Sequence, residues 1–402
     1  MRVSSDVEKV AAIRHELPPV QQYVYLNTGS NGPLPKASYI ALQNQALREW
    51  QEGRTRAQQI AQVVEMQEAA RIAFAGVLGC APDEVALTHS TTEGINIALM
   101  GLNWQPGDEV ISATTEHSGG LYPLFLLEQR YGVALRMTQI GVAGLDPVAA
   151  LQHALQAGRR TRAVILSHVS WSTGRVLPVA ELARVAHEAG ALFICDAAQS
   201  CGMVPSDVEA LGADVYACAG QKWLCGPQGA GAVYVRRERM GEIQQTFIGT
   251  TGIETNGFVE GQLIGGPGAF VPPAGAKRYE ALTLHPSSVL AMTASLEWLT
   301  SQVGWEWIYR RIQELGKYCY QELRKVPGVT IHTPAEAMAG LVHFHLEGIV
   351  PAKLTERLEQ RDVLIRDVGD PAVNRVSTGF YNTREDIDHL IDAILAIKRE
   401  PC

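Results

Sequence analysis

The chain has 402 residues, of which 46% are hydrophobic and 19% are charged, as expected for a globular protein with a large core. Its formal net charge of −8 provides no basic surface, so nucleic acid and anionic lipid are not expected as partners. No apolar run is long enough for a transmembrane helix, and the charged first twenty residues lack the apolar segment of a signal peptide.

The seven cysteines do not form a recognisable disulfide or metal framework. Their number is odd and several lie within apolar runs, which favours buried, reduced thiols in a cytoplasmic protein over disulfides. They are Cys80, Cys195, Cys201, Cys218, Cys225, Cys319 and Cys402. No CxxC pair or His/Cys cluster has zinc-ligand spacing, so no metal is expected.

In chain order, an N-terminal segment (residues 1–22) precedes a short strand and a Gly/Pro turn that ends at Pro35. Helical patterns follow at 36–51 and 58–78. Short β-branched runs then alternate with amphipathic stretches, which predicts βαβ units and a mainly parallel sheet. The predicted strands are 85–88, 109–112, 134–137, 163–166, 192–195, 215–218 and 231–235. The close spacing of the last three predicts shorter or antiparallel connections.

The second part of the chain reads as a separate α+β domain. Residues 241–285 are rich in Gly, Pro and Thr and should be irregular, and a long helical pattern covers 287–326. Further strands, a helix and a last helix at 383–398 follow. We therefore expect an α/β fold with a large domain at 23–285 and a smaller C-terminal domain at 286–402, on which the N-terminal segment packs.

The first candidate ligand site is the junction of a strand and a helix at residues 88–96. Ser90, Thr91 and Thr92 lie where the helix begins, and the N–H groups and dipole of a helix start attract phosphate. The same hydroxyls are also ordinary helix N-caps, which need no ligand. Glu93 does not suit a phosphate and is expected to point away.

Two further motifs follow predicted strands. His117 leaves a strand end and could stack on a planar ring, although loop histidines are often surface or capping residues. Asp196 ends a fully apolar strand, where a carboxylate is costly to bury unless it meets a cation such as a protonated pyridine nitrogen. Asp196 could instead cap the next helix. Gln199 is close enough in sequence to donate to the same ring.

Lys222 lies in an apolar setting flanked by glycines, within residues 217–229. Burial without an acidic neighbour in the sequence favours the neutral form of a lysine amine. A neutral amine is the form that attacks a carbonyl carbon. The alternative is a surface lysine in a turn.

Together these motifs resemble the class V aminotransferase branch of fold-type I pyridoxal phosphate (PLP) enzymes, the cysteine desulfurase-like group, over nearly the whole chain. The resemblance implies the PLP-dependent transferase fold, PLP as cofactor, a small amino-acid substrate and a homodimer with sites near the interface. It implies these roles: Lys222 forms the Schiff base, Asp196 pairs with the pyridine nitrogen, Gln199 meets the ring oxygen, His117 stacks on the ring, Ser90, Thr91 and Thr92 hold the phosphate, and Arg375 grips the substrate carboxylate.

The residues before Lys222 depart from the family pattern. The family usually has a hydroxyl residue, glycine and histidine there, whereas this chain has Ala219, Gly220 and Gln221. Gln221 can still donate to a phosphate, and Thr250 or Thr251 of a partner subunit would compensate for the lost contacts.

The loop before Arg375 separates two reactions. A cysteine desulfurase needs a mobile thiol there to attack the substrate sulfur, and residues 365–374 contain no cysteine. The remaining route is β-elimination, in which Lys222 takes the α-proton, the Cβ–S bond breaks, and the released aminoacrylate hydrolyses to pyruvate and ammonia.

Residues 25–35, residues 166–178 and the cysteine-free Arg366 loop look like the L-cysteine/L-cystine C-S lyase subgroup. That resemblance implies substrate contacts by Asn27, Trp171, Arg366 and Arg375. Two arginines would suit the two carboxylates of cystine, whose elimination yields cysteine persulfide, a sulfur donor for iron-sulfur clusters. Trp171 could instead be a packing aromatic, Arg366 a solvated charge and Arg375 part of a surface ion pair.

Other activities remain open on the same motifs. A desulfurase-like transferase, an amino-acid epimerase and an aminotransferase share the first steps. A binding protein on a retained PLP fold is a minor alternative, because the family contacts are altered at Ala219 and Gln221.

Overall fold

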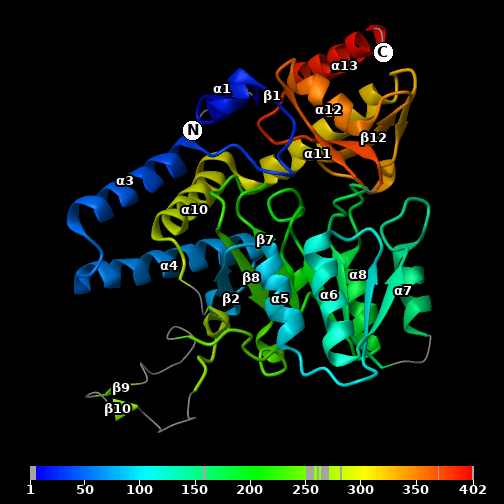
Figure 1. Ribbon diagram of the computed structural model, residues 1–402. Coiled ribbons are helices and arrows are strands. Elements are labelled where there is room, and N and C mark those ends of the chain that lie inside the picture. Colours follow the sequence, from blue (N-terminus) through cyan, green and yellow to red (C-terminus); the bar gives the residue numbers. More distant parts are fainter. Residues whose placement is uncertain are drawn as a thin grey trace.

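The computed structural model describes residues 6–156, 160–249, 258–259, 262–263, 271–280, 283–369 and 371–400. Figure 1 shows a large α/β unit with a smaller α+β unit, which carries the C-terminus, against one end of it. Within the described ranges, no helix has both the length and the apolar character that a membrane span requires. Nor do the side chains in these ranges include a His/Cys/Asp/Glu group suited to a metal ion.

The central sheet of the large unit has seven strands in the order β2-β8-β7-β6-β5-β3-β4. They are β2 (Val85–Thr88), β3 (Glu109–Ala113), β4 (Ala134–Thr138), β5 (Thr161–Ser167), β6 (Leu192–Asp196), β7 (Val215–Ala219) and β8 (Gly231–Val235). The five strands from β4 to β7 are parallel, whereas β8 is antiparallel to both β7 and β2. The mainly parallel sheet with an antiparallel finish is therefore confirmed.

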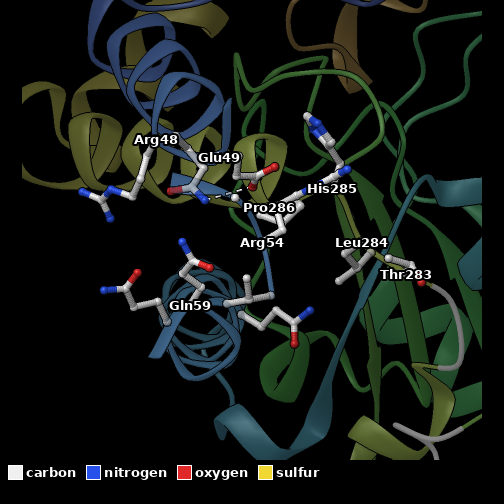
Figure 2. Close-up of a pocket in the computed structure, with 13 residues that line it drawn as sticks. Arg48, Glu49, Arg54, Gln59, Thr283, Leu284, His285 and Pro286 are labelled. Atoms are coloured by element: carbon white, nitrogen blue, oxygen red, sulfur yellow. Dashed lines mark hydrogen bonds between the residues drawn. The ribbon is translucent and has the colours of Figure 1, made fainter. Parts of the chain in front are cut away.

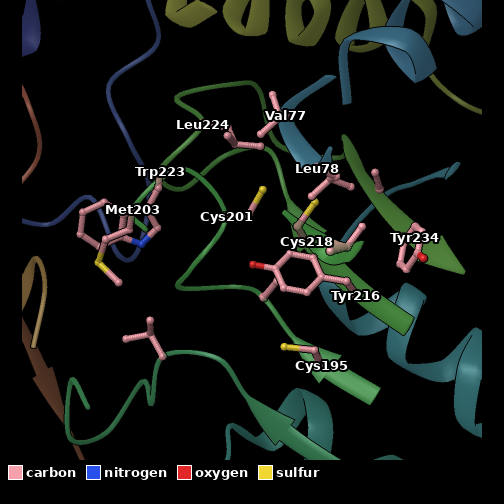
Figure 3. Packing of buried hydrophobic residues seen from close by; sticks show 14 of the residues in the cluster. Val77, Leu78, Cys195, Cys201, Met203, Tyr216, Cys218, Trp223, Leu224 and Tyr234 are labelled. Atoms are coloured by element: carbon pink, nitrogen blue, oxygen red, sulfur yellow. The ribbon is translucent and has the colours of Figure 1, made fainter. Parts of the chain in front are cut away.

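Helices cover this sheet because its strands are apolar on both faces and must be buried on both. They are α4 (Ala57–Leu78), α5 (Thr91–Gly101), α6 (Ser118–Tyr131), α7 (Pro147–Leu155), α8 (Val179–Glu188) and α9 (Val208–Leu211), with α3 (Lys36–Glu52) and α10 (Pro286–Trp298) packed on α4 or on each other. Figure 3 shows part of the resulting core, in which Tyr216 lies among Cys195, Cys201 and Cys218, and Trp223 belongs to the same cluster. These three cysteines are buried and free, as expected.

The small unit has a four-stranded antiparallel sheet in the order β11-β12-β15-β14. Its elements are β11 (Val329–Ile331), β12 (Leu341–Leu346), β14 (Arg366–Val368), β15 (Val373–Ser377), α11 (Trp305–Leu323), α12 (Pro351–Glu359) and α13 (Arg384–Arg399). The N-terminal helices α1 (Asp6–His15) and α2 (Pro19–Gln22) lead to β1 (Val24–Tyr25), which pairs with β13 (Val363–Leu364). The expected domain limits assign β1 to the large domain. In the structure, β1 pairs with β13, a strand of the small unit.

Short elements complete the fold. They are the 3₁₀ helices η1 (Pro82–Glu84), η2 (Arg237–Arg239), η4 (Ala276–Tyr279) and η6 (Ala335–Ala337), and the hairpin strands β9 (Phe258–Val259) and β10 (Gln262–Leu263).

The expectation of one helix over residues 287–326 is wrong. Helix α10 ends at Trp298, a π-helical turn η5 (Leu299–Val303) follows, and α11 begins at Trp305. Gly304 between them has φ of 88°, a conformation that favours glycine and cannot continue a right-handed helix. The apolar spacing on either side of this break is helical, so the pattern alone conceals it.

Candidate active site

A cavity of about 240 Å³ lies where parallel strands of the large sheet end and faces the small unit. Its lining is Gly29, Ser30, Ser90, Thr91, Thr92, His117, Trp171, Asp196, Ala198, Gln199, Ala219, Gln221, Lys222, Arg366 and Arg375. The structure thus gathers the predicted residues of four separate motifs, and both arginines, around one space. Of the remaining predicted site residues, Asn27 accepts a hydrogen bond from the Ser30 hydroxyl. Thr250 and Thr251 lie outside the described residues.

Lys222 lies in the turn that follows β7. The turn is closed by a hydrogen bond from the Cys225 N–H to the Lys222 carbonyl at 3.1 Å. Gly32 packs against that carbonyl so closely that a Cβ there would lie 2.3 Å from the oxygen, so this approach needs glycine. Burial lowers the pKa of Lys222 to about 8, and the charge of Asp196 opposes this shift. A substantial fraction of the amine is therefore neutral near physiological pH.

Asp196 ends β6 with its carboxylate buried at the cavity wall. Its Oδ1 accepts a hydrogen bond from the Ala198 N–H at 2.9 Å. Burial raises the pKa of Asp196, whereas this hydrogen bond and the charge of Lys222 lower it. The carboxylate would be better satisfied by a further cationic N–H donor, and a protonated pyridine nitrogen is one.

His117 is fixed by the backbone that follows it. Its Nδ1 accepts a hydrogen bond from the Gly119 N–H at 3.0 Å, which caps α6. Burial lowers the pKa of His117, and the Lys222 charge lowers it further. The ring is therefore neutral with its proton on Nε2. It packs edge-to-face with Trp171, with ring centroids 4.9 Å apart.

Gln199 is oriented by two hydrogen bonds. Its Oε1 accepts from the indole N–H of Trp223 at 3.0 Å, and its Nε2 donates to the Gly29 carbonyl at 2.9 Å. The second hydrogen on Nε2 remains available for an acceptor in the cavity. Trp223 thus orients Gln199, a role that its sequence context beside Lys222 did not suggest.

The hydroxyls at the start of α5 are divided between capping and the cavity. The Ser90 hydroxyl accepts a hydrogen bond from the Glu93 N–H at 3.2 Å. Ser90 is therefore the N-cap of α5, the alternative role that needs no ligand. The Thr91 hydroxyl is buried with no hydrogen-bond partner among the described residues. Glu93 turns to His89 instead, with an Oε2–Nδ1 distance of 2.8 Å. The helix start is therefore open to an anion.

Ser30, which the sequence reading missed, joins the two arginines. Its hydroxyl accepts from Arg375 at 3.1 Å and from Arg366 at 3.2 Å, and donates to Asn27 Oδ1 at 2.7 Å. Arg366 and Arg375 lie directly opposite each other in the β14–β15 ladder. Only the Gly-Ser turn marks Ser30 in the sequence, and such a turn has many other uses.

Arg375 is buried and its Nε has no hydrogen-bond partner among the described residues. Burial, and then the charge of Arg366, lowers the pKa of Arg375 to about 9. A buried guanidinium with an unused donor is strongly stabilised by a carboxylate. The Trp171 indole N–H is likewise buried without a partner in the described structure.

These observations test whether the site fits PLP. The cavity offers a buried acid for a pyridinium nitrogen, a neutral ring able to stack, a helix start with an unpaired hydroxyl for a phosphate and an amine of lowered pKa. The donors of Arg375 and Trp171 remain for a substrate. Gln221 also lines the cavity, where its amide nitrogen can donate to a phosphate, whereas its buried Oε1 has no hydrogen-bond partner among the described residues. The residues fit the group.

A larger cavity of about 510 Å³ lies between α3, α4 and the start of α10 (Figure 2). Its labelled side chains include Arg48, Glu49, Arg54 and His285. None of the site residues predicted from the sequence lines it. The chemistry is therefore assigned to the smaller cavity.

Comparisons with known proteins agree with this assignment. The family model described as Aminotransferase class-V matches residues 24–390. A probable cysteine desulfurase of Methanothermobacter thermautotrophicus is 27% identical, covering 94% of this chain and 95% of the relative. An isopenicillin N epimerase of Streptomyces clavuligerus is 29% identical, covering 94% and 95%. The structure of the cystine C-S lyase C-DES with its reaction product cysteine persulfide superposes with a TM-score of 0.87 at 27% identity, covering 94% and 98%.

Proposed function

This chain belongs to the class V aminotransferase family, and on that premise we propose that it is a lyase that cleaves the C–S bond of L-cysteine or L-cystine. The family, the α/β fold and the expectation of a PLP-dependent enzyme of class V are confirmed, and PLP is the cofactor. The relatives place the chain in the cysteine desulfurase and C-S lyase group. The substrate, the products and the individual roles of the site residues are the proposal.

One observation carries the choice of a lyase. The cavity brings together an amine of lowered pKa and two arginines, yet no cysteine is among its described lining residues. The six described cysteines include five buried ones, and burial raises the pKa of Cys225, the one in the Lys222 turn, to about 12. A thiol acceptor for sulfur transfer is thus missing from this part of the structure, which supports elimination.

In this proposal the side chains divide the work by position. Asp196 would hold the proton of the pyridine nitrogen, His117 would cover the ring, Gln199 would donate to the ring oxygen, and the start of α5 with Gln221 would hold the phosphate. When bound, PLP accepts the electron pair that is left when a proton leaves the substrate α-carbon. Arg375 binds the substrate α-carboxylate by charge-assisted hydrogen bonds.

Lys222 moves the proton. Once its nitrogen is free, the neutral amine takes the α-proton, and the Cβ–S bond breaks with its electron pair on sulfur. The released 2-aminoacrylate hydrolyses to pyruvate and ammonia. Cysteine gives sulfide, and cystine gives cysteine persulfide. Arg366 would hold the second carboxylate of cystine, because it lies beside Arg375 at the open side of the cavity.

A product assay tests the reaction. Purified protein with PLP is offered cystine, cysteine and alanine, and pyruvate, alanine, sulfide and elemental sulfur are measured. We expect pyruvate from cystine or cysteine. Alanine formed from cysteine instead would indicate a desulfurase and contradict the proposal.

The epimerase relative gives the second candidate function. An epimerase would exchange the α-hydrogen with solvent and invert the substrate without forming pyruvate. Exchange of solvent deuterium into a recovered amino acid, with its D-enantiomer present, would favour this candidate.

A matched pair of substitutions tests the substrate assignment. Arg366→Met should raise the KM for cystine at least tenfold but change the KM for cysteine little, because only cystine has a second carboxylate. Arg375→Met should raise both, since both substrates carry an α-carboxylate. An equal effect of Arg366→Met on both substrates would contradict the role given to Arg366.

A further inference from the structure

His343 lies behind the substrate side of the cavity, on β12, and it is fully buried. In the β12–β15 ladder it is directly opposite Arg375, so the two side chains project from the same face of the sheet. Its Nε2 lies 2.9 Å from the main-chain carbonyl of Trp171. A carbonyl only accepts hydrogen bonds, so Nε2 carries the proton.

The turn that carries Trp171 comes from the large unit but is bound to the small one. Beside the His343 contact, Thr333 Oγ1 donates to the Thr173 carbonyl at 2.7 Å, and Thr333 Oγ1 accepts the His343 N–H at 2.8 Å. The Val176 N–H donates to the Ala337 carbonyl at 2.8 Å. The position of Trp171 is therefore set by the small unit, which also holds Arg375.

The Trp171 turn approaches β12 closely at Gly174, beside His343. Gly174 has φ of 74°, and a Cβ there would lie 2.7 Å from the Leu341 carbonyl oxygen and 3.1 Å from His343 Nδ1. Burial, and then the charge of Arg375, lowers the pKa of His343 to about 3. The ring is thus neutral at any working pH. It can lie beside a buried guanidinium without repelling it, which a lysine or a second arginine could not do.

We propose that His343 is a positioning residue for the substrate carboxylate: its Nε2–H bond to the Trp171 carbonyl fixes the spacing between Trp171, which packs on His117, and Arg375. The inference deepens the proposed function, because it concerns how the same cavity recognises an amino acid. His343 touches neither the cavity nor the reacting atoms, since it is not among the lining residues.

The chain offers a matched control on the same strand. His345 is two residues further along β12, faces Thr330 of β11 in the ladder and is only partly buried. His343→Leu removes the donor with a side chain of comparable bulk. His343→Gln restores an N–H donor near the position of Nε2. His345→Leu makes the same change of residue type away from Trp171 and Arg375.

The test compares glycine with methylamine as ligands of the PLP-loaded protein, by titration of its visible absorbance. The two probes differ by a carboxylate. We expect His343→Leu to raise the glycine Kd about fivefold or more, the loss typical of one hydrogen bond, and to change the methylamine Kd less than twofold. His343→Gln and His345→Leu should both stay within about twofold of the original protein for both probes.

Three results would overturn the inference. They are an unchanged glycine Kd in His343→Leu, an equal rise of the glycine and methylamine Kd values in His343→Leu, or a glycine Kd of His343→Gln as high as that of His343→Leu. If His343→Leu does not fold, Thr333→Val loosens the same turn. It should raise the glycine Kd and spare methylamine, and an unchanged value would count against the inference. None of these results depends on pyruvate formation, so a failure of the lyase proposal shows separately, in the product assay.

Discussion

The reactivity of Lys222 depends on its surroundings, because they change the pKa of its amine. An ordinary lysine amine keeps its proton to about pH 10.4. Here burial takes the amine out of water, which lowers its pKa to about 8. Asp196 opposes the shift without cancelling it, so the site holds an acid and a partly neutral amine together.

The pKa of Lys222 predicts how cofactor attachment depends on pH. The neutral fraction of the amine should rise around pH 8 rather than above pH 10, because burial lowers the pKa to about 8. After cofactor removal, the rate of covalent PLP attachment should therefore increase from pH 7 to 9 and then level off. Stopped-flow absorbance measures this rate, and a lysine peptide corrects for the titration of PLP itself. A rate that keeps rising to pH 10.5 would contradict the lowered pKa.

Glu116, next to His117, is a buried carboxyl that the proposed chemistry does not use. Both of its oxygens accept from Ser167, one from the N–H at 3.0 Å and the other from the hydroxyl. Burial raises the pKa of Glu116 from 4.5 to about 7. The folded protein therefore keeps a proton that the unfolded chain loses, and Glu116 stabilises the fold less as pH rises from about 4.5 through 7.

Glu116→Gln removes this titration but keeps the shape and a hydrogen-bonding amide. Its free energy of unfolding relative to the original protein should therefore increase between pH 5 and pH 8, by up to about 3 kcal/mol. Urea midpoints of the cofactor-free proteins, measured across this range, provide the comparison. A difference that is flat, or that falls with pH, would show that Glu116 ionises normally.

At the scale of elements, the break between α10 and α11 is set by one residue. Gly304 occupies a φ of 88°, and η5 widens the turn before it, so that α11 can leave in a new direction. Trp298 and Leu299 remain buried on the large-unit side, and Ile308 is buried at the start of α11. The hydrophobic pattern continues across the break because both helices bury a face.

Gly304→Ala should destabilise the protein by about 1 kcal/mol or more, because a Cβ is strained at positive φ. Gly76 in α4 is the matched control, since it is helical and a Cβ there would meet nothing within 4 Å. Gly76→Ala should be neutral or stabilising by about 0.5–1 kcal/mol. Thermal unfolding of both variants tests this, and equal shifts would mean that the conformation at Gly304 carries no strain.

At the scale of the whole molecule, α3 and α4 leave apolar side chains in water. Trp50 is 81% exposed, and Leu47, Ile60 and Ile72 are exposed on the same two helices. Figure 1 shows this pair extending along one side of the large unit. Large apolar side chains exposed on both helices would suit an interaction surface. We propose that a second copy of the chain covers them, in line with the homodimer that the family resemblance implies.

Sedimentation should therefore give about twice the mass of one chain. Trp50→Asp should weaken the dimer at least tenfold, because it places a charge in an apolar interface. Val350 on the small unit, 66% exposed, is the control, and Val350→Asp should leave the mass unchanged. A monomeric original protein, or a Trp50→Asp dimer as tight as the original, would contradict this surface.

The sequence by itself determined the parts that depend on neighbours along the chain. These parts include the strands, the helix starts and the motifs of Asp196 and Lys222. Each can be recognised within a few positions, from the spacing of apolar residues or from the residue types themselves. The structure confirms the strands and gathers these motifs around one cavity. The break at Gly304 is the local feature that the pattern concealed.

Only the tertiary structure decided which distant segments meet. Ser30 reaches Arg375 across 345 positions, and His343 reaches the Trp171 carbonyl across 172. The pairing of β1 with β13 is of the same kind. A turn serine or a buried strand histidine carries no local signal of such a contact, because its partner is chosen by how the two units pack. The kind of chemistry at the site could therefore be predicted from the residue types, whereas the geometry of the site depends on long-range packing.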